Sequence, residues 1–174
     1  MQQRNGERES LAILARINPF KKKESIRISD YLDSRLISFL DVDTRDDAIN
    51  GLITLVETEI GLSNKKEFSK AVFYREQLVS TGIGMGVAVP HAKLTSFTDF
   101  FIVIGVQQKK GLEWYALDKA PVRLIFLIGG PEDRQTEYLQ LLSLLTSAIR
   151  DIDLRKHLLN ARTKEQILEL FSQF

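Results

Sequence analysis

Two apolar runs of strand length, Phe100–Ile104 and Val122–Ile128, constrain the fold of this chain more than any other feature. Both are largely free of the polar alternation of a strand with one wet face, so both suit a sheet that is covered on its two sides. The segments around them repeat apolar residues at helical spacing and can supply that cover. The pattern predicts an α/β layered domain in which helices flank a central group of buried strands.

Before the first apolar run, the sequence predicts two short strands and two helices. The strands, or edge segments, are Ile26–Tyr31 and Leu36–Leu40. Thr44 begins a sequence that resembles a capping box, and apolar residues at helical spacing follow it, which predicts a helix over about 44–60. Ser63 can cap the second helix.

After the second apolar run, the sequence predicts three helices. Asp153 can cap the second of them, and Thr163–Gln166 forms a capping box for the last. Trp114 and Tyr115, between the two apolar runs, are expected on a short strand or turn. The first of the three helices carries one apolar face, made by Tyr138, Leu141, Leu142, Leu145, Ala148, Ile149 and Ile152.

The composition excludes several kinds of site. The chain has 174 residues and no cysteine, which rules out disulfides, cysteine-ligated metals and a cysteine nucleophile. Its formal net charge of +1 gives no broad field for nucleic acid, and no apolar run approaches the ~20 residues of a membrane span. We expect a cytoplasmic protein with no metal, no cofactor, no nucleic-acid partner and no membrane insertion.

Residues 1–25 differ from the rest of the chain in charge. Six Lys and Arg side chains oppose three Glu side chains there, which leaves a charge of +3. The apolar residues in this segment are too few to build a core. We predict a basic, flexible N-terminal tail over 1–25 and one domain over 26–174.

Arg75 continues the inward apolar stripe of the second predicted helix. Such an arginine either reaches back to the surface or points its guanidinium at a group that needs a cation. A phosphoryl group in transfer is one such group, because a guanidinium can bind two of its oxygens. Glu76, beside it, could orient Arg75 or be solvated.

The segment from Ser80 to Gly86 places three glycines at alternate positions. Backbone N–H groups can crowd around an anion there, because no Cβ blocks the approach. The spacing matches neither the dinucleotide fingerprint nor the P-loop, so a nucleotide site is not supported, and a tight structural turn is the alternative. The candidate phosphate-binding residues are Ser80, Thr81, Gly82, Gly84 and Gly86.

His91 follows Pro90 directly and lies close in sequence to the glycine segment. A neutral imidazole keeps a lone pair and can accept and release a phosphoryl group, although a hydrogen-bonded structural role is the alternative. Arg75, the glycine segment and His91 together supply cation, anion cradle and nucleophile. The other histidine, His157, falls in a late predicted helix and is expected at the surface or a helix end.

The segment Arg75–His91, with the sequence REQLVSTGIGMGVAVPH, resembles the active-site signature of enzyme IIA domains of the phosphoenolpyruvate-dependent phosphotransferase system. It is similar to the fructose–mannitol class, especially to its nitrogen-regulatory member, and the likeness runs from about residue 26 to the end. The resemblance implies a mixed sheet between helices, with His91 accepting the phosphoryl group on Nε2 and Arg75 stabilising it.

The resemblance also implies the partners. Members receive phosphate from a histidine phosphocarrier protein, which enzyme I charges from phosphoenolpyruvate. We predict a phosphotransferase that carries phosphohistidine, with a regulatory, nitrogen-type signalling role toward a target protein. The alternatives are a sugar-transport enzyme IIA that passes phosphate to a separate enzyme IIB, a non-catalytic regulatory binding module, and a small-molecule anion binder. Candidate contacts for the donor are Ile83, Met85 and Phe97.

Tyr138 departs from the family pattern. Many members place a second histidine there, near the active site. A phenol can donate a hydrogen bond to phosphate but cannot carry positive charge, so phosphoryl transfer would be slower or phosphohistidine longer-lived. The alternative is that Tyr138 only packs in the core.

Overall fold

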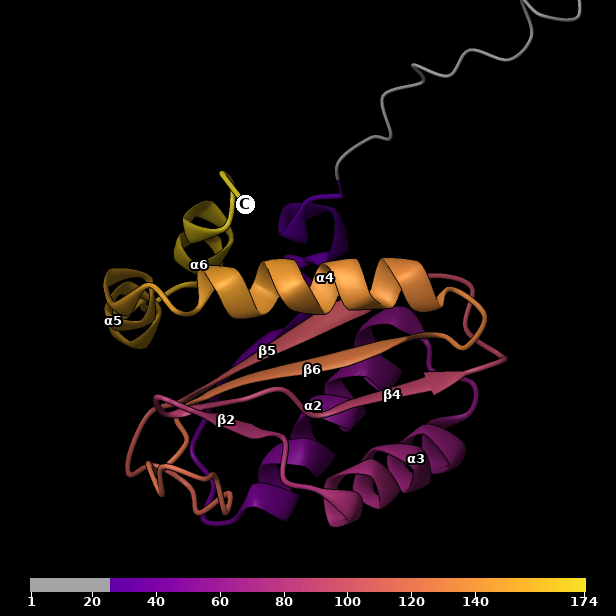
Figure 1. The fold of residues 1–174 in the computed structure, drawn as a ribbon, viewed down its shortest axis with the longest axis horizontal. Helices are drawn as coiled ribbons and strands as arrows, with labels where there is room; N and C mark the ends of the chain where they lie inside the picture. Colours follow the sequence, from indigo (N-terminus) through magenta and orange to yellow (C-terminus); the bar gives the residue numbers. More distant parts are fainter. Residues whose placement is uncertain (1–25) are drawn as a thin grey trace, which may run out of the picture.

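The two apolar runs form the centre of a six-stranded sheet. In the computed structural model, which describes residues 26–174, they become β5 (Phe101–Gln107) and β6 (Leu124–Pro131), which pair antiparallel. The predicted fold class is confirmed, because this mixed sheet lies between helices on both faces (Figure 1). The tail predicted over 1–25 lies outside the described residues.

Short strands complete the sheet around β6. The strand order is β1-β5-β6-β3-β2, and β4 also pairs with β6. β3 and β4 both run parallel to β6 and pair with successive parts of it, so they follow one another along one edge of that strand. The short strands are β1 (Ile37–Leu40), β2 (Gly82–Gly84), β3 (Val87–Ala88) and β4 (His91–Leu94).

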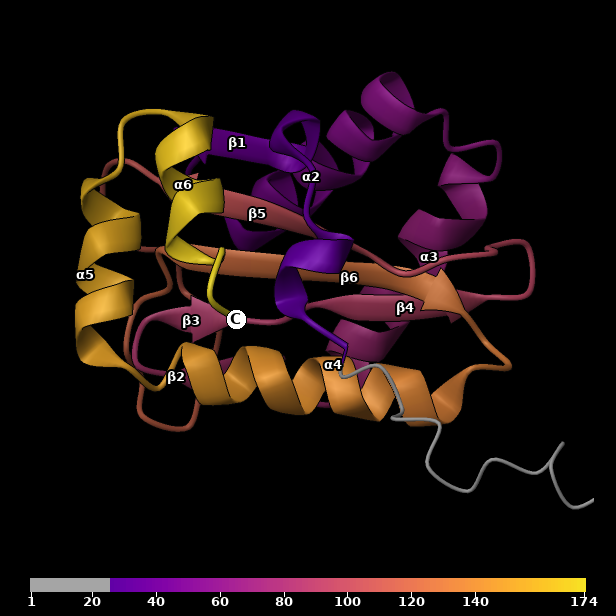
Figure 2. The same ribbon diagram turned by 90° about the horizontal axis from the view of Figure 1, so that it is seen from above.

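Helices cover the sheet on its two sides, with α2 and α3 on one face and α4, α5 and α6 on the other (Figures 1 and 2). Thr44 and Thr163 cap α2 and α6, as predicted. Among the described helices, none combines the length and apolar content that crossing a bilayer requires. The helices are α2 (Arg45–Ile60), α3 (Lys65–Leu78), α4 (Gln135–Ala148), α5 (Ile152–Asn160) and α6 (Lys164–Leu170), with 3-10 turns η1 (Ile28–Tyr31) and η2 (Ser34–Leu36).

Alternate residues of the central strands enter different cores. Ile102 and Ile104 of β5 pack with the helices α4–α6, whereas Val103 joins the core on the α2 side. In β6, Phe126 packs on the α4–α6 side and Leu127 on the α2 side. Successive side chains of a strand point to opposite faces, so a strand between two helical layers is apolar at every position.

The strand predicted over Ile26–Tyr31 is wrong, because the chain forms η1 there. The Asp30 carboxylate accepts a hydrogen bond of 3.2 Å from the Arg27 amide and closes a turn. A local bond between side chain and backbone of this kind competes with extended structure. The second predicted strand is confirmed as β1, which pairs parallel with β5.

Two predicted caps are displaced by one or two residues. The N-cap of α3 is Asn64 and not Ser63. Asp151, not Asp153, caps α5, and its carboxylate accepts from the Asp153 amide at 2.8 Å. Asp151 takes the capping role because it keeps an extended backbone just before the first turn, and sequence alone does not distinguish two nearby aspartates, whereas Asn64 precedes α3 without a side-chain capping bond.

Candidate functional site

His91 and Arg75 meet where β4 and α3 pack together. His91 is the first residue of β4 and pairs with Ile128 of β6. Arg75 lies in the last turn of α3, and its Nε donates a hydrogen bond of 3.1 Å to His91 Nε2. The guanidinium is anchored a second time, because Nη1 donates to the Val79 carbonyl at 2.8 Å. The structure therefore brings the two predicted residues into direct contact.

The His91 ring is held through both of its nitrogens. Nδ1 lies 2.9 Å from the carbonyl oxygen of Val89, which can only accept, so Nδ1 carries the proton. Nε2 is then the acceptor for Arg75. This assignment follows from the partners and leaves the lone pair on Nε2.

The surroundings favour a neutral His91. Burial, the largest cause, lowers the pKa of His91 below 6.5, and the charges of Arg75 and Lys93 lower it further. The hydrogen bond with Val89 and the charge of Glu76 act in the opposite direction. The pKa is lowered on balance, so at neutral pH the ring keeps the lone pair that a nucleophile needs.

Tyr138 packs in the core and beside His91 at once. The predicted inward face of α4 is buried at Tyr138, Leu141 and Leu145, but Ile152, predicted on the same face, begins α5 and is 56% exposed. The Tyr138 ring centroid lies 5.6 Å from that of His91 and 6.2 Å from that of Phe100. Burial raises the pKa of the Tyr138 phenol above 10.0, so the phenol stays protonated. Tyr138 is therefore buried in the core, as one alternative predicted, and lies near His91, as the other predicted.

Lys93 is a second cation near His91, and sequence reasoning missed it. It lies two residues after His91 on β4, so both side chains stand on the same face of the strand. Its ammonium group lies 5.0 Å from the centroid of the Tyr138 ring and donates to Gln135. Its spacing from His91 would have been informative only if β4 had been predicted.

The glycine segment forms a hairpin of β2 and β3, whose turn contains Met85. Gly84, Met85 and Gly86 all have positive φ, of 89°, 59° and 76°. A Cβ at Gly84 would lie 2.8 Å from Asp118 Oδ2, so glycine is required there for backbone and contact alike. The tight structural turn that the sequence offered as an alternative is therefore present.

Several amides of the glycine segment already have acceptors within the protein. The Gly82 amide donates to Ser80 Oγ at 3.1 Å, and the Met85 amide donates to Asp118 Oδ2 at 2.7 Å. The Ser80 hydroxyl donates in turn to the Trp114 carbonyl. A phosphate-holding role stays a prediction for Ser80, Thr81, Gly82, Gly84 and Gly86.

Glu76 takes neither of the roles expected for it. It is only 4% exposed, and its carboxylate accepts a 3.0 Å bond from the Thr81 amide and a second from the Thr81 hydroxyl. Arg45 Nη1 lies 3.9 Å from the carboxylate. Trp114, fully buried in the loop before β6, donates from Nε1 to Thr81 Oγ1 at 3.2 Å. The carboxylate therefore anchors the start of the glycine segment to α3.

The three candidate contacts for a donor protein differ in exposure. Ile83 and Met85 are each 42% exposed on the hairpin. Phe97 is half-buried, and its ring packs against Phe68 and Phe101 with centroids 5.2 and 5.4 Å away. Ile83 and Met85 are therefore the more available of the three.

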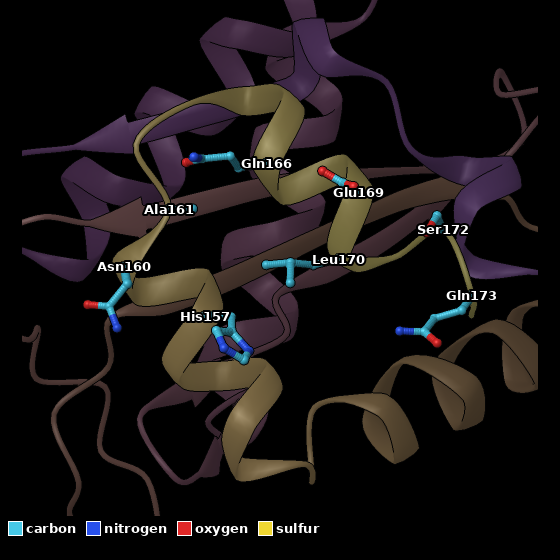
Figure 3. Close-up of a pocket in the computed structure, with 8 residues that line it drawn as sticks. All are labelled: His157, Asn160, Ala161, Gln166, Glu169, Leu170, Ser172 and Gln173. Carbon is cyan, nitrogen blue, oxygen red and sulfur yellow. The ribbon is translucent and has the colours of Figure 1, made fainter.

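A pocket of about 640 Å³ lies away from these residues, between α5, α6 and the C-terminal residues (Figure 3). Neither Arg75, His91 nor Tyr138 lines it. His157 does, and its predicted surface position is confirmed, since it is exposed on α5. Across residues 26–174, no group of three or more His, Asp or Glu side chains is placed to hold a metal ion.

Comparison with known proteins identifies the family of the chain. The family model described as "Phosphoenolpyruvate-dependent sugar phosphotransferase system, EIIA 2" matches residues 30–174. The chain belongs to this EIIA family. The resemblance drawn from Arg75–His91 is thereby confirmed, and this EIIA protein is a phosphoryl carrier of the phosphotransferase type.

Relatives of this EIIA protein include regulatory and sugar-specific members. A nitrogen regulatory protein of Klebsiella oxytoca is 32% identical over 126 residues, which are 72% of this chain and 77% of the relative. A PTS system fructose-specific EIIABC component of Bacillus subtilis strain 168 is 29% identical over 149 residues, 85% of this chain but 23% of the relative. The crystal structure of nitrogen regulatory protein IIA-Ntr from Neisseria meningitidis matches with a TM-score of 0.77 and 27% identity, covering 83% of this chain and 99% of that one.

Proposed function

We propose that this EIIA protein accepts a phosphoryl group on Nε2 of His91 from a histidine phosphocarrier protein. The observation that carries the proposal is the orientation of the ring. Nδ1 is bound to the Val89 carbonyl, and Nε2 faces the Arg75 guanidinium. The nitrogen with the lone pair is thus the one beside the cation that an incoming phosphoryl group needs.

In the transfer step, the Nε2 lone pair attacks phosphorus and a new N–P bond forms. The N–P bond of the donor phosphohistidine breaks, and its electron pair returns to the donor imidazole. The positive charge that develops on the His91 ring is stabilised by the Val89 carbonyl at Nδ1. Arg75 gives up Nε2 and binds phosphoryl oxygens, while its bond to Val79 keeps the guanidinium at the site.

The proposed partner of the phosphorylated protein is a regulatory target, which binds according to the phosphorylation state of His91. The support is the 32% identity to a nitrogen regulatory protein, matched over 77% of its length, and the TM-score of 0.77 to nitrogen regulatory protein IIA-Ntr. Phosphorylation would replace a neutral ring by roughly two negative charges, which a partner can distinguish. The identity to the fructose-specific relative supports the second candidate, a sugar-transport enzyme IIA with a separate enzyme IIB.

The test uses enzyme I, the histidine phosphocarrier protein and labelled phosphoenolpyruvate. We expect acid-labile label on the wild type, none on His91→Ala and full label on the matched control His157→Ala. An unlabelled wild type, or label that persists on His91→Ala, contradicts the proposal.

The partner of the phosphorylated protein is tested separately. Purified enzyme IIB should leave the label in place if the role is regulatory and should remove it if the role is sugar transport. A regulatory target that binds wild type, His91→Ala and the charged His91→Asp equally well would instead indicate a binding module without use for the phosphate.

A further inference from the structure

A closed series of contacts surrounds the bond between Arg75 and His91. Glu76, the neighbour of Arg75 on α3, accepts from the amide and hydroxyl of Thr81. The Thr81 carbonyl accepts from the Val89 amide at 3.0 Å, and the Val89 carbonyl holds His91 Nδ1 at 2.9 Å. The series returns to α3 where Arg75 Nε donates to His91 Nε2.

The hydrogen bonds between Glu76 and Thr81 are costly to lose, because the Glu76 carboxylate is buried. Only 1% of the Glu76 side-chain surface is exposed, so its oxygens depend on protein donors. Both oxygens act as acceptors toward Thr81, a pattern that suits a carboxylate and that a carboxamide cannot reproduce. Thr81 is itself buried and receives a further bond from Trp114. The position of Thr81 is therefore fixed from two sides.

Thr81 matters for the ring because it is the hairpin partner of Val89. A shift of Thr81 would move the Val89 amide, and the Val89 carbonyl belongs to the same short segment that leads into β4. Without that carbonyl, Nδ1–H loses its acceptor in this set of contacts, and the Arg75 bond alone favours the proton on Nδ1. The other tautomer would carry the proton on Nε2, where Arg75 also donates, and would have no lone pair for the phosphoryl group.

We propose that Glu76 is a positioning residue for phosphoryl transfer, which fixes the tautomer and orientation of His91 through Thr81 and Val89. The proposal rests on His91 being the phosphoryl acceptor, and it adds the residue that selects Nε2 as the attacking nitrogen. Glu76 touches neither reacting nitrogen and acts through other residues.

The test compares Glu76→Gln with Glu67→Gln, an equal change at an exposed glutamate of the same helix. The first measurement is the ¹⁵N NMR spectrum of the imidazole nitrogens in the unphosphorylated protein, which is simple because the chain has 2 histidines. We expect the proton of His91 on Nδ1 in the wild type and in Glu67→Gln, and a mixture of tautomers in Glu76→Gln. The second is the rate of phosphoryl transfer from the phosphocarrier protein, which should fall by on the order of tenfold or more in Glu76→Gln alone.

A merely structural glutamate gives a different result. If Glu76→Gln is less stable or slower while the His91 tautomer stays as in the wild type, the positioning role is overturned, and unchanged rate and tautomer overturn it as well. Should Glu76→Gln fail to fold, Thr81→Val keeps the amide link, removes the bonds of the hydroxyl to Glu76 and Trp114, and must shift the tautomer in the same direction. A wild type that accepts no phosphate defeats the proposed function instead, while the NMR comparison still decides the role of Glu76.

Discussion

At His91, burial and two neighbouring cations act on one imidazole in the same direction. Burial disfavours the charged ring, and Arg75 and Lys93 repel a second positive charge. The hydrogen bond to Val89 opposes them without reversing the shift of the pKa. The two cations that help to keep the ring neutral, Arg75 and Lys93, would also stabilise the negative charge of a phosphoryl group bound to it.

An NMR titration should give a His91 pKa below 6.5. Because the pKa is lower in the folded state than in the unfolded chain, the unfolded chain binds the proton more readily as the pH falls. Folding stability is unaffected by His91 above the unfolded pKa and decreases as the pH falls from there toward the folded pKa. His91→Gln should therefore lose less of its free energy of unfolding between pH 7 and pH 5 than the wild type. An equal loss in both proteins would contradict the shift.

Replacing Tyr138 by histidine should restore a charge that a phenol cannot supply. The Tyr138 ring centroid lies 5.6 Å from that of His91 and 5.0 Å from the Lys93 ammonium, so a histidine there would take up its proton once the dianionic phosphoryl group is beside it, and could then bond to the phosphoryl oxygens. A charge-assisted hydrogen bond exceeds a neutral one by about 1 kcal/mol, so phosphoryl transfer should be about fivefold faster in Tyr138→His. Rapid-quench measurement with labelled phosphocarrier protein checks this, and Tyr138→Phe is the control for packing. A rate in Tyr138→His no higher than that of the wild type would leave Tyr138 as core packing.

The sequence predicted the residues whose chemistry is visible in their type, and missed those whose role depends on contacts. Arg75 and His91 were found because a guanidinium on an apolar stripe and a histidine after a glycine segment are unusual. Glu76 was named only as a residue that could orient Arg75 or be solvated, because its burial results from Thr81 folding back over α3. Lys93 was missed since a lysine in an unassigned segment resembles any solvated residue.

Between elements, the β2–β3 hairpin depends on a backbone that only glycine adopts without strain. Gly84→Ala would force a Cβ to within 2.8 Å of Asp118 at a φ of 89°. We expect a loss of about 1–3 kcal/mol in the free energy of unfolding, measured by urea denaturation. The matched control is Gly51→Ala in the middle of α2, where the nearest atom lies 4.0 Å from the new Cβ. That change should stabilise by about 0.5–1 kcal/mol, and equal effects at the two glycines would contradict the argument.

Elements that begin with a local signal were predicted, and elements that depend on distant partners were not. The helices α2 and α6 follow from Thr44 and Thr163, whose side chains cap them. β2, β3 and β4 have two to four residues each; β3 and β4 pair with β6, and β2 pairs with β3. β1 is as short as β4 but was predicted from the apolar run Leu36–Leu40, and none of these three strands carries a run of that length. The sequence therefore predicted which residues form the candidate site, but not how their side chains are arranged.

At the scale of the whole fold, the exposed apolar residues of 26–174 are concentrated in the elements that form the candidate site. Seven of the large exposed hydrophobic residues come from the last turns of α3, the hairpin and the loop before β6: Tyr74, Leu78, Val79, Ile83, Met85, Tyr115 and Leu117. The loop packs on the hairpin through the bond between Asp118 and Met85, so the two share one surface. Exposed apolar patches are typical of interaction sites, and we expect this one to bind the phosphoryl donor protein.

Leu78 tests this surface, since it lies three residues after Arg75 on α3 and is 59% exposed. Leu78→Gln removes apolar contact without touching the bond between Arg75 and His91. At the centre of an interface the loss is about 1–2 kcal/mol, so the phosphocarrier concentration that half-saturates transfer should rise roughly fivefold to thirtyfold. Ile152→Gln on α5, 56% exposed outside this surface, is the control and should behave as the wild type. If Leu78→Gln and Ile152→Gln need the same donor concentration, the donor binds elsewhere. If only the maximal rate of Leu78→Gln falls, the substitution has disturbed His91 itself, and the NMR signal of the His91 ring would show that change.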